Sequence, residues 1–319
     1  MSRHIGPGIS QKEKFRGIRS HMKVAVTGGA GFIGSHLVDR LVQEGHEVIV
    51  LDNMSTGRNE NIAEIIDRIK IVECDIGKSG EWMKELTDVK WVFHLAALAD
   101  IVPSIQNPEA YFQSNVDGTF NVLRASQLSG VMRFIYAASS SAYGIPDTYP
   151  TPEESTIQPE YPYALTKYLG EMLVLHWFKV YALSAVSMRF FNVYGTRSRT
   201  SGTYGAVFGV FLAQKLAGKP FTVVGDGEQT RDFTHVSDVV NALIAVANSN
   251  KAGRVYNVGS EATVSVNHLT DLLGGEKIHI PKRPGEPDCT HADISRIKEE
   301  IGWRPKVTIE SGVAEIESL

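Results

Sequence analysis

The stretch that decides the fold is KVAVTGGAGFIG, residues 23–34. It begins with a β-prone run and continues into glycines that fit G-x-G-x-x-G from Gly29 to Gly34, while Gly28 adds the variant with glycines three apart. Residues 32–43 then carry apolar side chains at three- and four-residue spacing, which predicts a helix. A glycine turn between a strand and a helix lets backbone N–H groups approach a pyrophosphate, so the stretch predicts a dinucleotide site. For the motif alone, a tight turn without a ligand is the alternative.

From Lys23 onward, β-rich runs alternate with helical patterns, which indicates an α/β fold with a doubly wound parallel sheet of the Rossmann type. The expected strands are Lys23–Thr27, Glu47–Asp52, Lys70–Cys74, Trp91–Leu95, Arg133–Ala137 and Ser184–Phe190. The expected helices between them are Phe32–Gln43, Pro108–Leu128 and Tyr161–Tyr181.

After Asn192 the pattern changes to a loop, Thr196–Gly205, followed by expected helices at Phe208–Leu216 and Ser237–Asn248. Arg254–Val258 is expected to be a strand that returns to the sheet, and the last helix is expected near Ile294–Glu300. We therefore divide the chain into residues 1–21, 22–190 and 191–319. These are a disordered or tag-like extension, a dinucleotide-binding domain and a smaller, interleaved substrate domain. The Ser20-His21-Met22 junction resembles a cloning site.

Composition narrows the class of protein. The 319 residues are 43% hydrophobic and 21% charged, which is ordinary for a soluble globular protein. A net charge of −4 argues against a nucleic-acid binder. Cys74 and Cys289 are the two cysteines, so neither a disulfide framework nor a metal site is expected, and a cytoplasmic location fits. No apolar run approaches the roughly 18 residues that span a bilayer.

Asp52 ends the second expected strand, where an acid would bind the adenosine ribose and repel a 2′-phosphate. No arginine directly follows it, so NAD is expected rather than NADP, and Arg58 is the one residue that would weaken this argument. Asp75 faces the adenine edge or caps a helix. The residues expected to contact the cofactor around these positions are Gly28, Gly31, Phe32, Ile33, Gly34, Asp52, Asn53, Asp75, Ile76, Leu95 and Ala97.

Tyr163 and Lys167 stand four residues apart, so both project from one face of a helix. A tyrosine titrates near pH 10, and a neighbouring ammonium together with a cationic nicotinamide would help to ionise it at neutral pH. An exposed Tyr–Lys pair is the alternative for this motif. Ser139, in the Ser-Ser-Ser run that follows the fifth strand, could hydrogen-bond the reacting oxygen and pass its proton to the phenolate.

In this order, the glycine turn, Asp52, the serine run and Tyr163-x-x-x-Lys167 resemble the extended short-chain dehydrogenase/reductase family. The likeness is greatest to its nucleotide-sugar 4-epimerases, and it covers Lys23 to Val313. It implies a Rossmann fold, NAD and the catalytic set of Ser139, Tyr163 and Lys167, with the last two also contacting the cofactor. Sister dehydratases and decarboxylases carry an acid where this chain has Ser140 or Ser141, so the resemblance favours epimerisation.

The resemblance also implies contacts to a nucleotide sugar. By analogy, Asn192, Arg231 and Arg283 would hold the diphosphate, and Glu286 the uridine ribose. Thr290 is small where some relatives carry a bulky residue that excludes N-acetyl sugars. The residues expected to bind substrate are Ser140, Ser141, Asn192, Arg231, Arg283, Glu286 and Thr290.

The expected reaction is 4-epimerisation of UDP-Glc/UDP-Gal, and of UDP-GlcNAc/UDP-GalNAc, through a transient 4-keto sugar. UDP-glucuronate is the leading rival substrate, because Arg199 lies where uronate epimerases can carry a carboxylate-binding arginine, although those enzymes tend to have Thr in place of Asn192. A net NAD(H) reductase and a non-enzymatic NAD-sensing module are the competing classes. The intact Ser139, Tyr163 and Lys167 set argues against a sensor. The family also implies a homodimer through the helices 108–128 and 161–181.

Overall fold

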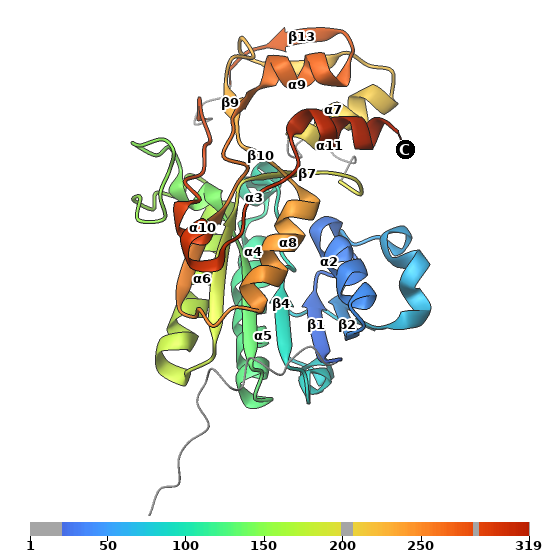
Figure 1. Ribbon diagram of the computed structural model, residues 1–319, viewed down its shortest axis with the longest axis vertical. Helices are drawn as coiled ribbons and strands as arrows, with labels where there is room; N and C mark the ends of the chain where they lie inside the picture. Colours follow the sequence, from blue (N-terminus) through green and yellow to red (C-terminus); the bar gives the residue numbers. More distant parts are fainter. Residues whose placement is uncertain (1–20, 199–206, 283–286, 319) are drawn as a thin grey trace, which may run out of the picture.

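The computed structural model describes residues 21–198, 207–282 and 287–318, and the alternating pattern after Lys23 forms a seven-stranded parallel sheet there (Figure 1). The strand order is β11-β6-β5-β4-β1-β2-β3. β4 and β5 are buried along their whole length, since helices cover both faces of the sheet. The strands are β1 (Lys23–Thr27), β2 (Glu47–Asp52), β3 (Ile69–Glu73), β4 (Trp91–His94), β5 (Arg133–Ser139), β6 (Ala185–Phe190) and β11 (Arg254–Val258).

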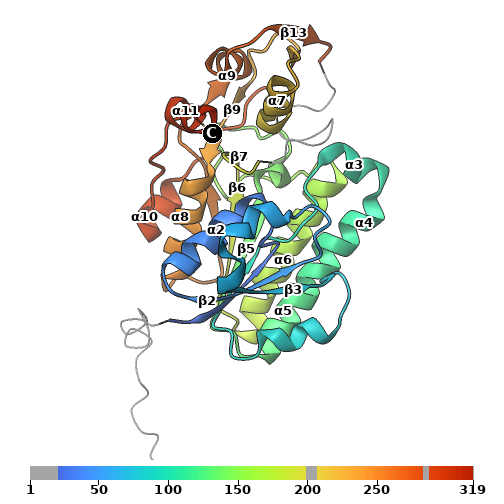
Figure 2. The same cartoon turned by 90° about the vertical axis from the view of Figure 1, so that its right-hand side faces the viewer.

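Helices pack on the sheet in two layers (Figure 2). On one face, α2 (Phe32–Gln43) and α8 (Val236–Ala247) bury Leu37, Val38 and Leu243 in the core. On the other face, α5 (Gly118–Leu128) and α6 (Pro162–Tyr181) bury Val122 and Val174. The remaining short helices of this lobe are η1 (Asn59–Arg68), η2 (Glu81–Leu86), α3 (Ile101–Gln106), α4 (Pro108–Phe112), η3 (Gln113–Asp117) and η4 (Ser140–Tyr143).

The expected elements of this lobe are confirmed in type. Three of the expected strands, β1, β2 and β11, have the expected bounds, and the ends of the others differ by at most two residues. The single helix expected over 108–128 is a run of three parts, because η3 adds a π-helical turn between α4 and α5. Its buried Asn115 donates to Leu98 O (3.0 Å) and accepts from Leu98 N (2.8 Å). The turn therefore fixes the segment that follows β4.

The strand order reverses beside β1. β2 and β3 extend the sheet on one side of it, whereas β4 crosses over and pairs with β1 on the other. In a doubly wound sheet, ligands bind outside the carboxyl ends of the strands at such a reversal. The segments after β1 and β4 meet there.

A smaller lobe lies beyond the carboxyl ends of the strands, at the top of Figure 1. Its own core contains Phe208, Phe211 and Phe221. The lobe is held by the strand pairs β8–β13 and β9–β12, and β7–β10 joins it to the sheet lobe. Its elements are β7 (Asn192–Tyr194), α7 (Val207–Leu216), β8 (Phe221–Val224), β9 (Thr230–Arg231), β10 (Phe233–His235), β12 (Val264–Ser265), α9 (Val266–Leu273), β13 (Lys277–Ile280) and α11 (Ile309–Glu317).

The chain does not stay in the small lobe after Phe191. β11 pairs with β6 at the edge of the sheet, and α10 (Ser295–Ile301) packs on β11. The helix expected near Ile294–Glu300 is confirmed as α10, but the expectation that it is the last helix was wrong, because α11 follows it. Thr308 caps α11 by accepting from Ser311 N, so the signal for this helix was present in the sequence. In the part of the chain that the structure describes, no helix is long and apolar enough to cross a membrane.

Candidate active site

A cleft of about 1530 Å³, including its open mouth, lies at the reversal of the strand order. All the cofactor contacts expected around the strand ends line it, namely Gly28, Gly31, Phe32, Ile33, Gly34, Asp52, Asn53, Asp75, Ile76, Leu95 and Ala97. Residues from β5 and from the joint between the lobes also line it, among them Ala137, Val193, Arg197 and Ser198. The sequence interpretation did not include these four as cofactor contacts.

The glycine turn is as tight as the motif predicts. Gly28 has φ +70°, and a Cβ placed on Gly34 would stand 2.0 Å from the Gly28 carbonyl oxygen. The N-terminus of α2 has no side-chain cap at Gly31, so its first N–H groups are left to the cleft. This arrangement fits the pyrophosphate of a dinucleotide.

Asp52 is held toward the same cleft by two backbone donors. Ala30 N donates to its Oδ2 at 3.0 Å and Met54 N to its Oδ1 at 2.9 Å. The remaining lone pairs can accept from ribose hydroxyls, and the negative charge disfavours a 2′-phosphate. The guanidinium of Arg58, which would weaken the case for NAD, donates to Arg197 O at 3.0 Å. Asp75 lines the cleft and accepts from Gly77 N in a turn. The alternative role as a helix N-cap is wrong, because the next helix, η2, begins at Glu81 after its N-cap Gly80.

The expected acid/base group lies where the cleft ends at β5. Ser139 terminates this strand, and its Oγ lies 2.6 Å from Ser141 Oγ. Tyr163, in the first turn of α6 after Pro162, is hydrogen-bonded to both serines. Partial burial raises the pKa of the Tyr163 phenol, and the two serine hydroxyls oppose this rise. The serines thus stabilise the phenolate from the side of the sheet.

Lys167 lies one helical turn further along α6 and is 4% exposed. Its Nζ stands over the ring of Tyr136, 4.4 Å from the centroid, and Tyr136 OH donates to Lys167 O at 3.1 Å. Burial lowers the pKa of the Lys167 ammonium to about 7, while the carboxylate of Glu171 opposes the shift. Tyr163 and Lys167 are not among the residues that line the cleft; the cleft reaches β5 at Ala137.

The expected substrate residues fall into two groups. Ser140 and Ser141 form η4 directly after β5. Asn192 and Thr290 meet where the lobes join, because Thr290 Oγ1 donates to Asn192 Oδ1 at 2.9 Å. Arg231 lies beside them with 6% exposure and donates to Thr230 O at 2.9 Å. Arg283 and Glu286, like Arg199, lie outside the described residues.

Asp232 was not assigned a role from the sequence, yet its backbone joins this second group, because its N–H donates to Thr290 Oγ1 at 3.3 Å and its carbonyl oxygen accepts from Asn192 N at 3.1 Å. It is fully buried and accepts from Ser260 N (2.6 Å), Ala292 N (3.1 Å) and Thr234 Oγ1 (3.3 Å). Burial raises the pKa of the Asp232 carboxyl, and these hydrogen bonds lower it. A single acid beside an arginine gives too weak a pattern to find such a residue in the sequence.

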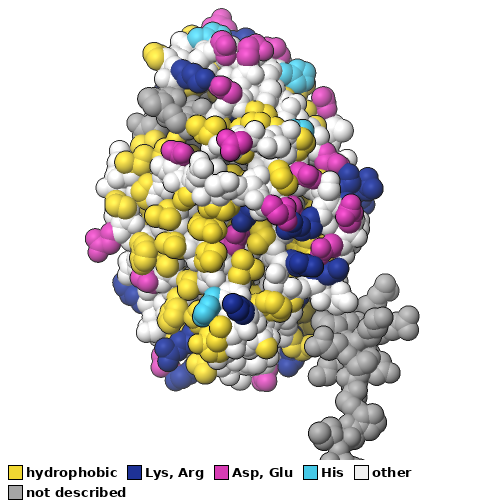
Figure 3. Space-filling model, turned by 90° about the vertical axis from the view of Figure 1, so that its left-hand side faces the viewer, with side chains coloured by type: hydrophobic (Ala, Val, Ile, Leu, Met, Phe, Trp, Pro, Cys, Tyr) yellow, Lys and Arg dark blue, Asp and Glu magenta, His cyan; other side chains and the backbone are white. Residues whose placement is uncertain are grey.

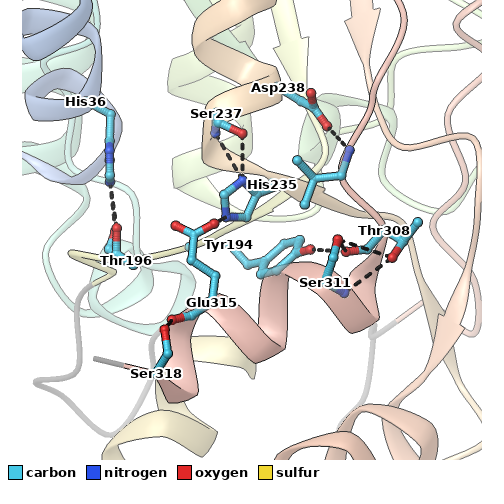
Figure 4. A network of polar contacts seen from close by, with 12 residues as sticks. His36, Tyr194, Thr196, His235, Ser237, Asp238, Thr308, Ser311, Glu315 and Ser318 are labelled. Carbon is cyan, nitrogen blue, oxygen red and sulfur yellow. Dashed lines mark hydrogen bonds and ion pairs between the residues drawn. The ribbon is translucent and has the colours of Figure 1, made fainter.

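The joint between the lobes is built around Tyr194, the last residue of β7, and the residues that follow it (Figure 4). His36 of α2 donates through Nε2 to Thr196 O at 3.0 Å, and Tyr194 donates to Thr308 O, just before α11, at 3.2 Å. Arg197 also pairs with Asp39 of α2 at 2.7 Å. The wall of the cleft that carries Arg197 is therefore anchored to α2.

Comparison with known proteins agrees with this geometry. The model of the NAD dependent epimerase/dehydratase family matches residues 24–259. A UDP-glucose 4-epimerase of Mycolicibacterium smegmatis is 36% identical over 308 residues, covering 92% of this chain and 96% of that protein. The structure of a Thermotoga maritima UDP-glucose 4-epimerase with UDP-glucose superposes with a TM-score of 0.86 and 34% identity, covering 93% of this chain and 99% of that one.

The structure of a Bacillus cereus UDP-glucuronic acid 4-epimerase, in complex with UDP-glucuronic acid and NAD, superposes with a TM-score of 0.85. It is 31% identical and covers 93% of this chain and 99% of that one. The family model covers most of the chain, and the glycine turn, Asp52 and the cleft fit its cofactor. The chain belongs to the NAD-dependent epimerase/dehydratase family and is an NAD-dependent epimerase of nucleotide sugars.

Proposed function

We propose that this enzyme interconverts the C4 epimers of UDP-hexoses, both UDP-Glc/UDP-Gal and UDP-GlcNAc/UDP-GalNAc. The observation that carries the proposal is the hydrogen-bonded group of Ser139, Ser141 and Tyr163 where the dinucleotide cleft meets β5. Ser140 and Ser141 stand where dehydratases and decarboxylases carry an acid. A site with a proton acceptor but no acid for elimination suits a reaction that only inverts a carbinol.

In this proposal, Tyr163 takes the proton of the sugar 4-hydroxyl through Ser139. Bound NAD would supply the acceptor and donor for the C4 hydride, which must return to the opposite face of the sugar carbon for the configuration to invert. Tyr163 then returns its proton to the 4-keto oxygen, again through Ser139. Lys167 would contact the nicotinamide ribose and favour the phenolate, and Asp52 would hold the adenosine ribose. The pKa of about 7 for Lys167 leaves it partly protonated at neutral pH.

For the substrate, Asn192 and Arg231, together with Arg283, would hold the diphosphate, and Glu286 the uridine ribose. The buried setting of Arg231 suits a charge that must stay in place for a dianion. Thr290 Oγ1 donates to Asn192 Oδ1 at 2.9 Å, and we propose that the small side chain at this position admits an N-acetyl group. UDP-glucuronate is the second candidate, supported by Arg199 and by the sugar bound to the Bacillus cereus relative.

The test is to incubate the holoenzyme with UDP-Glc, UDP-GlcNAc and UDP-GlcA in turn and to identify the products by proton NMR. We expect the C4 epimers of the first two sugars, with no net change in absorbance at 340 nm. Complete exclusion of UDP-GlcNAc would refute the role of Thr290. Turnover of UDP-GlcA alone would replace the proposed substrate class, and steady NADH production would indicate a reductase.

We also propose a homodimer formed through α5 and α6. Large apolar side chains are exposed on the face that these helices carry, and Figure 3 shows hydrophobic side chains gathered on that side of the molecule. They include Phe120, Leu128, Leu165, Met172 and Phe178. Contiguous apolar patches of this kind mark interfaces. Sedimentation should give twice the mass of the chain, and Met172→Lys should yield monomers.

A further inference from the structure

The active-site helix also carries a buried ion pair that the reaction above does not use. Glu171 is 2% exposed, and its Oε1 lies 2.5 Å from Arg189 Nη2. Its Oε2 accepts from Arg189 Nε (3.1 Å) and from Ser187 Oγ (2.8 Å). Glu171 belongs to α6, whereas Ser187 and Arg189 belong to β6, so the pair fastens the catalytic helix to the sheet.

The same arginine reaches the serine turn. Arg189 Nη1 donates to Tyr143 OH at 2.8 Å and to Glu153 O at 3.0 Å. Tyr143 ends η4, the turn that begins directly after Ser139, and its hydroxyl donates to Asn257 Oδ1 of β11 at 2.7 Å. One buried guanidinium thus connects the helix of Tyr163 and Lys167 with the turn that carries the serines.

Glu171 also follows Lys167 by four residues, which puts the two side chains on one face of α6 about 5–6 Å apart at Cβ. The other groups around Lys167 add little charge of their own. Tyr136 presents its ring from β5, and burial raises the pKa of its phenol, so it is neutral. His94 of β4 is neutral because burial lowers its pKa to about 3. Glu171 supplies the negative charge that opposes the loss of the Lys167 proton.

We propose that Glu171 and Arg189 are positioning residues of the proton-transfer centre: Glu171 keeps Lys167 charged, and Arg189 holds the serine turn in place against α6. This inference rests on the proposed roles of Tyr163 and Lys167. The negative charge of Asp100 raises the pKa of the Tyr163 phenol. A charged ammonium at Lys167 is therefore needed to favour the phenolate.

The experiment compares pH profiles of kcat for the wild-type holoenzyme and for Glu171→Gln. The glutamine keeps the size and an acceptor for Ser187 but removes the charge. An opposite charge at this range raises an ammonium pKa by one unit or more, so we expect the alkaline limb, on which Lys167 loses its proton, to move down by about one pH unit. Ser187→Ala is the matched control. It removes one hydrogen bond from the same carboxylate and leaves the charge, so the alkaline limb of its kcat profile should stay at the wild-type pH.

Glu171→Gln leaves the buried charge of Arg189 without its partner, which is destabilising and could prevent folding. A second variant therefore keeps the test possible. The double variant Glu171→Leu/Arg189→Met removes both charges with apolar groups of similar size, and its limb should also move down. Unchanged limbs in both folded variants, alongside an inactive Tyr163→Phe, would overturn this inference and leave the proposed reaction standing. An active Tyr163→Phe would overturn the proposed reaction and this inference with it.

Discussion

The sheet lobe and the small lobe build their proposed binding sites in different ways. In the sheet lobe, the cleft is lined by short segments that directly follow strands, and each segment can be located by its own pattern. In the small lobe, the expected substrate residues meet only through the tertiary fold, as Asn192 and Thr290 do across 98 positions of the chain. The comparison teaches that the cofactor cleft is encoded locally, whereas the proposed sugar site depends on how distant segments pack.

The two lobes also differ in their proposed contributions to catalysis and to substrate binding. The residues proposed for proton transfer and most of the cleft lining belong to the sheet lobe, whereas the small lobe adds Val193 and Phe208 to the cleft and Arg231 and Thr290 to the joint. Changes in the sheet lobe should therefore alter turnover or cofactor affinity, while changes confined to the small lobe should alter stability or substrate affinity.

The largest effect is expected for Tyr163→Phe. Loss of the proton acceptor should lower kcat by about 10²–10⁴-fold, because that is what a positioned acid/base contributes. The NAD content of the purified variant, measured by absorbance after denaturation, should equal that of the wild type. Near wild-type turnover would end the assignment of chemistry to the sheet lobe.

Next comes Gly34→Ala, paired with Gly218→Ala of the small lobe. The Gly34 Cβ would meet the Gly28 carbonyl at 2.0 Å, so the glycine turn must open and NAD affinity should fall by about tenfold or more. Gly218 has φ +63° and open space around its Cβ, so alanine there should cost only about 1 kcal/mol and leave NAD binding unchanged. Titration with NAD and thermal unfolding separate the two results. Equal losses of NAD affinity would break the comparison.

These two lobes also differ in how well the sequence predicted them. Asp52 and the glycine turn could be placed because a strand end and a tight turn have few solutions. The strands β9 and β12 are two residues each, too short to show an alternating pattern, and were missed. Helix α11 was missed although Thr308 caps it. Lys167 was expected beside Tyr163, but its position over the ring of Tyr136 depends on how α6 packs on β5.

A smaller effect concerns pH and His94 of the sheet lobe. His94 is fully buried between Thr27 Oγ1 (2.7 Å) and Thr119 Oγ1 (2.9 Å), and burial lowers its pKa from 6.5 to about 3. Below pH 6.5 the unfolded chain binds a proton that the folded chain refuses, so stability is present above pH 6.5 and is lost as the pH falls toward 3. Between pH 6.5 and 5 the loss from this group should be about 2 kcal/mol.

Urea unfolding at both pH values measures this loss, and His94→Gln should show a smaller difference between them. His235 of the joint is also buried with a lowered pKa, but Glu315 opposes the shift from 3.7 Å, so His235→Gln should remove less of the pH dependence. If His235→Gln removed more of the pH dependence of stability than His94→Gln, the joint and not the sheet lobe would contribute the larger share of it.

The smallest effect is expected for Thr308→Ala in the small lobe. Its Oγ1 caps α11 by accepting from Ser311 N, and losing such a cap costs about 1 kcal/mol. The unfolding midpoint should fall slightly while kcat and NAD affinity stay at wild-type values. A change in NAD affinity would show that α11, which contacts the joint through Tyr194 and Thr308, also shapes the cofactor cleft.

The return of β11 to the edge of the sheet has a consequence for engineering this enzyme. Since β11 pairs with β6, and α8 and α10 also pack in the sheet lobe, the chain passes back into the sheet lobe between segments of the small lobe, so the small lobe is not a separate C-terminal addition. Truncating the chain after Phe190 would remove β11 and α8. The backbone of β6 would lose its pairing partner, and the apolar side chains that α8 covers would be exposed. Grafting a cap of different sugar preference onto this scaffold would require exchanging several separate inserts while β11 stays behind.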